Sequence, residues 1–145
     1  MVKAESSRGG FVDVEVIGIA EARRFLNAKG KDIQNAVEGA IFQSANFVQQ
    51  EVQESLLGRR AEPKSVDTGK LVNSIRVDKI NSDTFVVFPQ KQSYPNGQST
   101  QEVAKILEYG TTKISPRRHF RNTSKRTKDK TKNFVEKAIK RATRS

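Results

Sequence analysis

Residues 32–57 carry the longest regular hydropathy pattern of the chain, and this pattern limits the possible folds more than any other feature. Apolar residues recur there at helical spacing on one stripe, and polar residues such as Gln34 and Glu51 fill the opposite side. The stripe consists of Ile33, Val37, Ile41, Val48 and Val52. A helix of about 25 residues is about 38 Å long, enough to form the backbone of a small domain. The stripe predicts a core face, with the alternative that part of it meets another subunit.

Short segments around this helix predict a small sheet. Residues 11–16 alternate apolar and polar side chains, as a half-buried strand does. Residues 76–80 and 84–89 read as two strands joined by the turn-forming residues 81–83. Further helices are expected at 20–26, 67–75, 101–109 and from about 123 onward. The pattern predicts an α+β fold: a small, mainly antiparallel sheet packed against one long helix, with a basic C-terminal helix.

The length of 145 residues favours one domain. We expect residues 11–145 to form it, after a flexible N-terminal arm at 1–10 that is polar and contains glycine and serine. Residues 90–100 predict a projecting loop around the Asn96-Gly97 turn signal. This loop is either a plain surface loop or one that reaches a neighbouring subunit or a ring lumen. The absence of cysteine excludes disulfides and thiolate metal sites.

The charge of the chain is concentrated near its end. The net charge is +11, and residues 117–145 hold twelve of the 27 Lys and Arg residues but only two acidic ones. Such asymmetry indicates a polyanion or an acidic protein surface as a neighbour, and a solvated helix face is the alternative. Residues 125–132 contain no apolar side chain, so we expect this part either to be solvated or to lie against something negative. The candidate contact residues are Arg117, Arg118, Arg121, Lys125, Arg126, Lys128, Lys130 and Lys132.

Three short motifs follow one another in the second half of the chain. The first is Val-Asp-Thr-Gly-Lys-Leu-Val-Asn-Ser-Ile at 66–75, a helix start in which Asp67 or Thr68 can cap the first turn and Gly69 tolerates a sharp entry. The second is Leu-Glu-Tyr-Gly-Thr at 107–111, where a glycine closes a helix. The third is Pro-Arg-Arg-His-Phe at 116–120.

In this order the motifs resemble those of the tail-completion proteins of long-tailed bacteriophages, also called head–tail joining or neck proteins. That family carries a VDTG-x-L-x-x-SI segment, a later E-aromatic-GT, and an R-P-F-like turn before a C-terminal helix. The resemblance extends from about residue 13 to about residue 139, and His119 stands where the family often has proline. The motif residues are Asp67, Thr68, Gly69, Leu71, Ser74, Ile75, Glu108, Tyr109, Gly110, Thr111 and Phe120.

The resemblance implies the α+β fold and a non-enzymatic structural role in the virion. It implies a ring of several copies, expected to be six, between the head connector and the tail tube or its terminator protein. Exiting viral DNA would then be a sequence-independent contact for the basic segment. The protein would be assembled in the host cytoplasm, because no apolar run long enough for a membrane span and no signal-peptide pattern is present.

The residues themselves give little support for catalysis, cofactor binding or metal binding. The single histidine, His119, lies in a basic run and is expected to pack in the turn beside Phe120. Glu108 is a possible partner of Arg117 or Arg118. No phosphate-binding glycine loop and no histidine–carboxylate cluster occurs, so we expect no catalytic residue, cofactor or metal. The alternative function is a cytoplasmic nucleic-acid-binding protein that uses its basic C-terminal helix without reading sequence.

Overall fold

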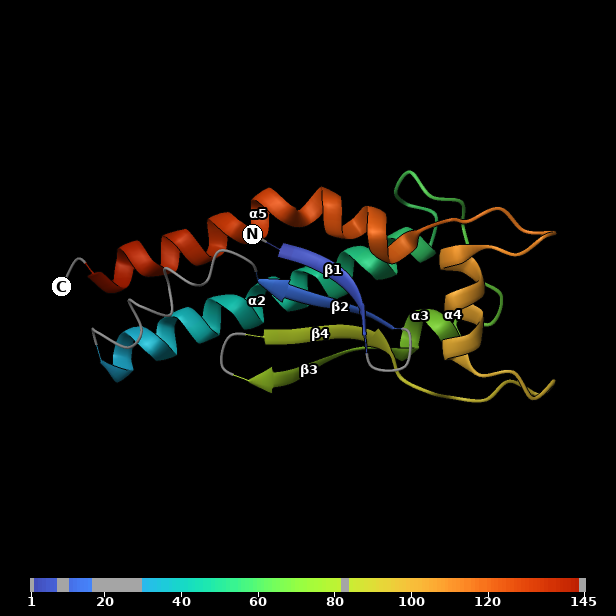
Figure 1. Cartoon of the computed structure of the whole chain (residues 1–145), viewed down its shortest axis with the longest axis horizontal. Helices are drawn as coiled ribbons and strands as arrows, with labels where there is room; N and C mark the ends of the chain where they lie inside the picture. Colours follow the sequence, from blue (N-terminus) through green and yellow to red (C-terminus); the bar gives the residue numbers. More distant parts are fainter. Residues whose placement is uncertain (1, 8–10, 17–29, 82–83, 144–145) are drawn as a thin grey trace.

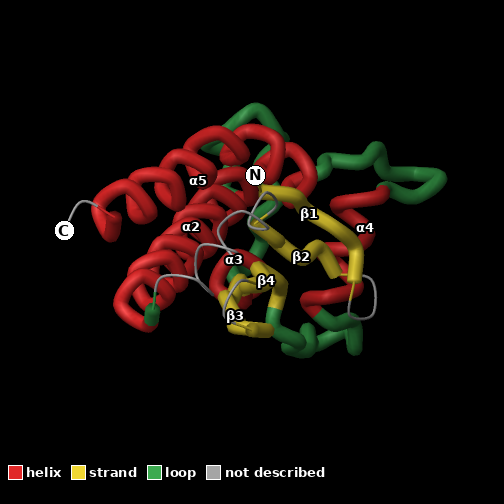
Figure 2. Tube along the Cα trace, turned by 60° about the vertical axis from the view of Figure 1, so that its left-hand side comes forward, coloured by secondary structure: helices red, strands yellow, loops and turns green. Residues whose placement is uncertain are grey.

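A computed structural model describes residues 2–7, 11–16, 30–81 and 84–143, and within them the side chains of 30–32, 34–81 and 84–142. Two long helices lie side by side and a four-stranded antiparallel sheet lies next to them (Figures 1 and 2). The elements are β1 (Val2–Ser7), β2 (Phe11–Val16), α2 (Lys31–Leu56), α3 (Lys70–Ser74), β3 (Ile75–Asn81), β4 (Thr84–Pro89), α4 (Thr100–Tyr109) and α5 (His119–Thr143). The predicted α+β fold is confirmed. The helix predicted at 20–26 lies outside the described residues.

The sheet has the strand order β1-β2-β4-β3. Residues 2–7 form its edge strand β1, with Val2 opposite Val16 and Ser7 opposite Phe11. The structure therefore differs from the flexible arm predicted at 1–10. Sequence pattern missed this strand because it has few apolar residues, and its ladder of backbone hydrogen bonds to β2 depends on the partner strand rather than on its own hydropathy.

The core lies between α2, the sheet and α5. The apolar stripe of α2 is buried, with Val37, Ile41 and Val48 at most 1% exposed. Phe85 and Val87 of β4 belong to the same cluster. The prediction that this stripe is a core face is therefore confirmed for the residues whose side chains are described.

The C-terminal helix α5 begins at His119, four residues before the predicted start, and its first half is packed rather than solvated. Thr123, Thr127 and Thr131 are four residues apart and at most 2% exposed. Their hydroxyls are satisfied within the helix, since Thr127 Oγ1 donates to the Thr123 carbonyl at 2.8 Å and Thr131 Oγ1 to the Thr127 carbonyl at 2.9 Å. A threonine whose hydroxyl is bonded in this way can present its methyl group to a neighbouring helix.

The surface of α2 that meets this part of α5 carries small residues. Ser44 is 1% exposed, and its hydroxyl lies 3.4 Å from the carbonyl oxygen of Thr131. Small residues on one helix and threonines on the other let the two backbones approach closely. The expectation that residues 125–132 are either solvated or in contact with a negative partner is therefore corrected: one face of this segment is core.

None of the helices in the described part of the chain combines the length and apolar character that crossing a membrane requires.

Candidate functional site

The first motif forms the entry to α3. The hydroxyl of Thr68 accepts a hydrogen bond from the Lys70 amide at 3.3 Å, and Gly69 has φ +82°, a conformation that glycine adopts without strain. Asp67 is exposed and forms no capping bond to α3 among the described residues. Of the two predicted caps, Thr68 is therefore the residue that contacts the first turn.

The rest of the first motif is buried and tied to α2. Leu71, Ser74 and Ile75 are at most 4% exposed. Two side chains of α2 reach the same segment: Gln49 Nε2 donates to the Ile75 carbonyl at 2.9 Å and Gln53 Nε2 to the Val72 carbonyl at 3.1 Å. These bonds satisfy carbonyl groups at the junction of α3 and β3. The motif therefore fixes the position of this junction on the long helix.

Glu108 of the second motif caps the C-terminal helix. Its carboxylate accepts hydrogen bonds from the amide of Phe120 at 2.9 Å and from the amide of Arg121 at 3.1 Å. A carboxylate at this place satisfies free amides of the first turn and interacts favourably with the helix dipole. Burial raises the pKa of the Glu108 carboxyl, and the two amides oppose that shift. The predicted side-chain partner, Arg117 or Arg118, is replaced by the backbone of α5.

Gly110 and Thr111 form the turn after α4. Gly110 has φ +74°, and a Cβ atom at this residue would lie 2.6 Å from the Ile114 carbonyl oxygen. The Thr111 hydroxyl accepts hydrogen bonds from the amides of Lys113 and Ile114 at 3.2 and 3.1 Å. Only glycine fits this turn without displacing the backbone. Tyr109, in contrast, is 52% exposed and has no such structural reason to be an aromatic residue.

His119 lies in a buried polar network rather than in a simple turn contact. Its Nδ1 is 2.7 Å from the hydroxyl of Ser55, and its Nε2 is 2.8 Å from the hydroxyl of Ser65. Ser55 donates its proton to Glu62 at 2.5 Å, so it accepts one from Nδ1, and Ser65 donates to Nε2. Burial lowers the pKa of His119 to about 4, which keeps the imidazole neutral.

Glu62 links this network to α5. Its carboxylate is buried and accepts two hydrogen bonds of 2.7 Å from the guanidinium of Arg126. Burial opposes ionisation of Glu62, but the hydrogen bonds from Arg126, Ser55 and Asn122 together hold its pKa at about 2. Sequence reasoning missed Glu62, Ser55 and Ser65 because they come from a loop and a helix end that no spacing rule connects to His119. An acidic residue flanked by basic ones in a loop was the only available signal.

Ser65 and His119 resemble part of a hydrolytic triad, but their surroundings are those of a structural contact. His119 is 1% exposed. The Ser65 hydroxyl is also held by the guanidinium of Arg117 at 2.8 Å and lies 3.1 Å from the Pro63 carbonyl. Three partners and a weakly basic imidazole leave little nucleophilic character. The network fastens the loop between α2 and α3 to the start of α5.

The eight basic candidates of the C-terminal segment divide into two groups. Arg117 and Arg126 bind the network, Lys130 lies 4.5 Å from the ring centre of Phe47, and Lys132 lies 3.9 Å from Glu136. The other four are exposed, and no hydrogen bond or ion pair connects their side chains to a described residue. Arg118 directly precedes α5, and the other three are three or four residues apart within it, so these three follow one side of the helix start. We call these four residues the cationic stripe: Arg118, Arg121, Lys125 and Lys128.

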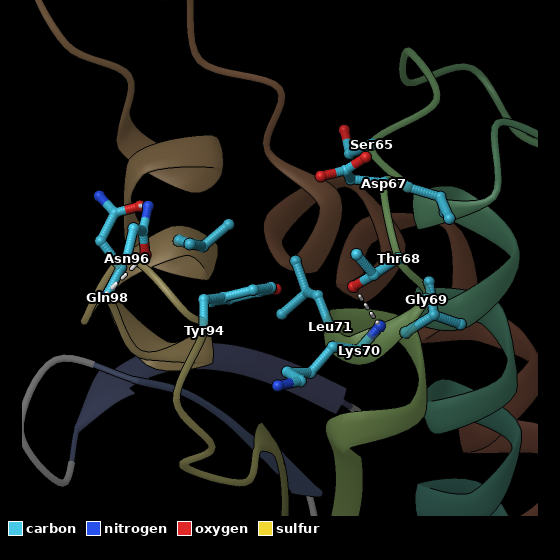
Figure 3. A pocket seen from close by; sticks show the side chains of 12 residues that line it. Ser65, Asp67, Thr68, Gly69, Lys70, Leu71, Tyr94, Asn96 and Gln98 are labelled. Atoms are coloured by element: carbon cyan, nitrogen blue, oxygen red, sulfur yellow. Dashed lines mark hydrogen bonds between the residues drawn. The ribbon is translucent and has the colours of Figure 1, made fainter.

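The predicted loop at 90–100 is a hairpin-like turn held against α3. Ser93 and Ser99 pair across it, and Gly97 has φ +88° at its tip. Lys70 Nζ donates to the Ser93 carbonyl at 2.7 Å and lies 5.4 Å from the ring centre of Tyr94. Between this loop and the first motif is a hollow of about 190 Å³ (Figure 3). Its walls are mixed polar and apolar, and it contains no cluster of carboxylates or histidines.

Elsewhere in the described residues, no group of three or more potential metal-ligating side chains is present. The structure thus brings the three motifs to one end of the molecule. There, α3, α4 and the start of α5 meet the C-terminal end of α2 (Figure 1). Their polar residues are used in caps and turns rather than gathered around a reaction centre.

The family described as "Bacteriophage HK97-gp10, putative tail-component" matches residues 20–110, which include the first motif and the second motif up to Gly110. No curated protein and no solved structure matches the chain. The matched region covers well over half of the sequence. The chain therefore belongs to the HK97-gp10-like family of bacteriophage tail components.

Proposed function

We propose that this phage tail component is a tail-completion, or neck, subunit, and that a ring of copies joins the head connector to the tail tube. Family membership over residues 20–110 carries the proposal. The structure supports a structural rather than a catalytic role, because the motif residues serve as caps, turns and core positions. The expected copy number is six, and the expected neighbours are the connector and the tail-tube or terminator proteins.

The cationic stripe supports a position beside a polyanion. Its four side chains are exposed, and none of them forms an ion pair with a described acidic residue. DNA leaves the head through the lumen of a neck, so its backbone is one neighbour that such a stripe fits without sequence reading. The second neighbour that the stripe fits is the acidic surface of an adjoining connector protein. Autonomous nucleic-acid binding, the alternative function, uses the same stripe but has no support from the family.

The test is electron microscopy of particles made after a stop codon is placed early in this gene. The proposal expects DNA-filled heads beside separate, finished tails, because only the joining step would be missing. Complementation with the intact gene should restore joined particles. Tails of abnormal length, or intact particles, would contradict the neck position.

A further inference from the structure

Four large apolar side chains of the described residues are exposed. Phe42 and Ile80 are 48% and 39% exposed, and Tyr109 and Ile114 are 52% and 39% exposed. Figure 1 shows that the end of the sheet where β3 finishes and β4 begins lies far from α4, which lies beyond the opposite end of β4. Large exposed apolar side chains that gather in patches mark interaction surfaces.

Phe42 borders a hollow, which we call the α2 hollow. It has a volume of about 500 Å³ and is lined by Asn35, Glu38, Gly39, Phe42, Lys79 and Phe85. The Phe42 and Phe85 rings are 5.4 Å apart and tilted by 37°. A Cβ atom at Gly39 would meet no other atom within 4 Å, so the glycine leaves an open wall.

Tyr109 and Ile114 belong to the end of α4 and the turn after it, a surface that we call the α4 knob. Tyr109 ends α4, and the Thr111 amide donates to the Ile114 carbonyl at 2.8 Å, which places Ile114 in the same turn. Beside Tyr109, a second hollow of about 410 Å³ is lined by Glu102, Lys105, Ile106, Tyr109 and Gly110. Aromatic residues at such positions are typical of the centres of protein–protein interfaces.

The two surfaces also match in charge. One acidic and one basic side chain border the α2 hollow, Glu38 and Lys79, and they form an exposed ion pair. One acidic and one basic side chain likewise border the α4 knob, Glu102 and Lys105, and both are exposed. In an antiparallel arrangement of the two pairs, each charge meets its opposite.

We infer that the α4 knob of one copy inserts Tyr109 into the α2 hollow of the next copy. The two patches lie at opposite ends of the sheet, so they cannot meet within one chain. A contact between two different patches is heterologous, and it closes into a ring when the rotation per copy divides a full turn. The inference rests on the proposed ring and names the two surfaces that build it.

A substitution at Gly39 is expected to raise the stability of the fold and to weaken the association between copies. Gly39→Leu should raise the melting temperature by a few degrees, because leucine favours a helix over glycine and the site is open. The same side chain fills the α2 hollow, so we expect association between copies to weaken by about tenfold or more. Gly39→Ala is the matched control: it gains helix propensity, but its methyl group leaves the hollow largely open. Equal association of the Leu variant and the native chain would overturn the inference.

Disulfide trapping tests the pairing directly, because the native chain contains no cysteine. Particles are made with Glu38→Cys, with Lys105→Cys, or with both substitutions, which leave Tyr109 and Gly39 in place, and are then oxidised. The double variant should give a ladder of linked chains up to the full ring, and each single variant should give none. Linked dimers of a single variant would show an isologous contact and overturn the inference, as would a double variant that is present in particles but not linked.

The same variants separate this inference from the proposed function. If the protein is absent from purified particles, the neck proposal fails. The interface is then tested on a concentrated mixture of the two purified single variants. A linked heterodimer in that mixture supports the knob-into-hollow contact, and monomers alone overturn it.

Discussion

Glu62 and Arg126 are 64 residues apart in sequence and are joined by two parallel hydrogen bonds of 2.7 Å. The carboxylate belongs to the loop between α2 and α3, whereas the guanidinium belongs to α5. The Glu62 side chain is 2% exposed, and that of Arg126 is 31% exposed. This pair therefore connects the loop to the C-terminal helix at the place where the buried histidine network also lies.

Loss of the Arg126 guanidinium should destabilise the fold. Arg126→Met leaves the Glu62 carboxylate buried without its main partner, so we expect the free energy of unfolding to fall by about 2–4 kcal/mol. Lys128→Met is the matched control, because Lys128 is exposed and has no bonded partner among the described residues. It should change stability by less than about 0.5 kcal/mol. Urea unfolding of both variants measures the difference, and equal losses would contradict the structural role of the pair.

Stability should fall on acidification in a way that depends on His119. Folding lowers the pKa of this imidazole from 6.5 to about 4, so the unfolded chain binds the proton more readily. The stabilising contribution is complete above about pH 6.5 and is lost as the pH falls towards 4, by roughly 2–3 kcal/mol. Glu62 adds a second loss as the pH falls from its ordinary pKa of 4.5 to its folded pKa of about 2.

The variant His119→Gln isolates the first of these contributions. Its stability at pH 7 should be lower than that of the native chain, but the difference between pH 7 and pH 4.5 should be much smaller. Urea midpoints at several pH values measure both quantities. A variant with the native pH dependence would show that another group titrates in this range.

Alanine substitutions at two glycines with positive φ distinguish the cost of the backbone conformation from the cost of a steric clash. Gly110→Ala places a Cβ atom 2.6 Å from the Ile114 carbonyl oxygen, whereas Gly97→Ala meets nothing within 4 Å. Both substitutions place an alanine at positive φ, which costs about 1–3 kcal/mol. The additional clash should make Gly110→Ala more destabilising by at least about 1 kcal/mol in thermal unfolding. Similar melting temperatures for the two variants would mean that the turn after α4 can relax.

Two charged substitutions test whether the face of α5 that carries Thr123, Thr127 and Thr131 is buried. Thr127 is 2% exposed, so Thr127→Lys should cost about 3 kcal/mol or more, because a charge would be placed between α2 and α5. Asp129→Lys, two residues further on, alters an exposed position and should be nearly neutral. If circular dichroism melts show both variants to be equally stable, the first half of α5 is not packed.

DNA contact by the cationic stripe has a specific salt signature. Replacing Arg118, Arg121, Lys125 and Lys128 by Gln should reduce the slope of log affinity against log salt by about 3–4, since each phosphate contact contributes about 0.9 for duplex DNA. The control replaces four exposed lysines elsewhere: Lys31, Lys64, Lys91 and Lys113. Filter binding of the assembled protein across salt concentrations measures the slopes. Equal slopes for the two variants would assign the stripe to a protein partner or to solvent.

Local patterns in the sequence were sufficient for the elements whose signals are contained in a few neighbouring residues. The apolar stripe of α2 predicted a helix and its buried face, and the turn residues between β3 and β4 predicted a hairpin. The closing glycine at 110 and the turn signal at Asn96-Gly97 were also readable, because backbone conformation there depends on the residue itself.

Tertiary structure decided the features that depend on partners distant in sequence. Hydropathy marked residues 125–132 as polar, yet Thr127 and Thr131 are core residues because their hydroxyls bond within α5 and α2 offers small side chains. Glu108 was a candidate partner of arginine and instead caps α5, and His119 joins two serines and, through Ser55, Glu62. Sequence alone therefore determined most of the helices and strands, but not β1, and the family to which the chain belongs. The pairing of buried polar groups was set only when the packed helices brought them within hydrogen-bonding distance and removed them from water.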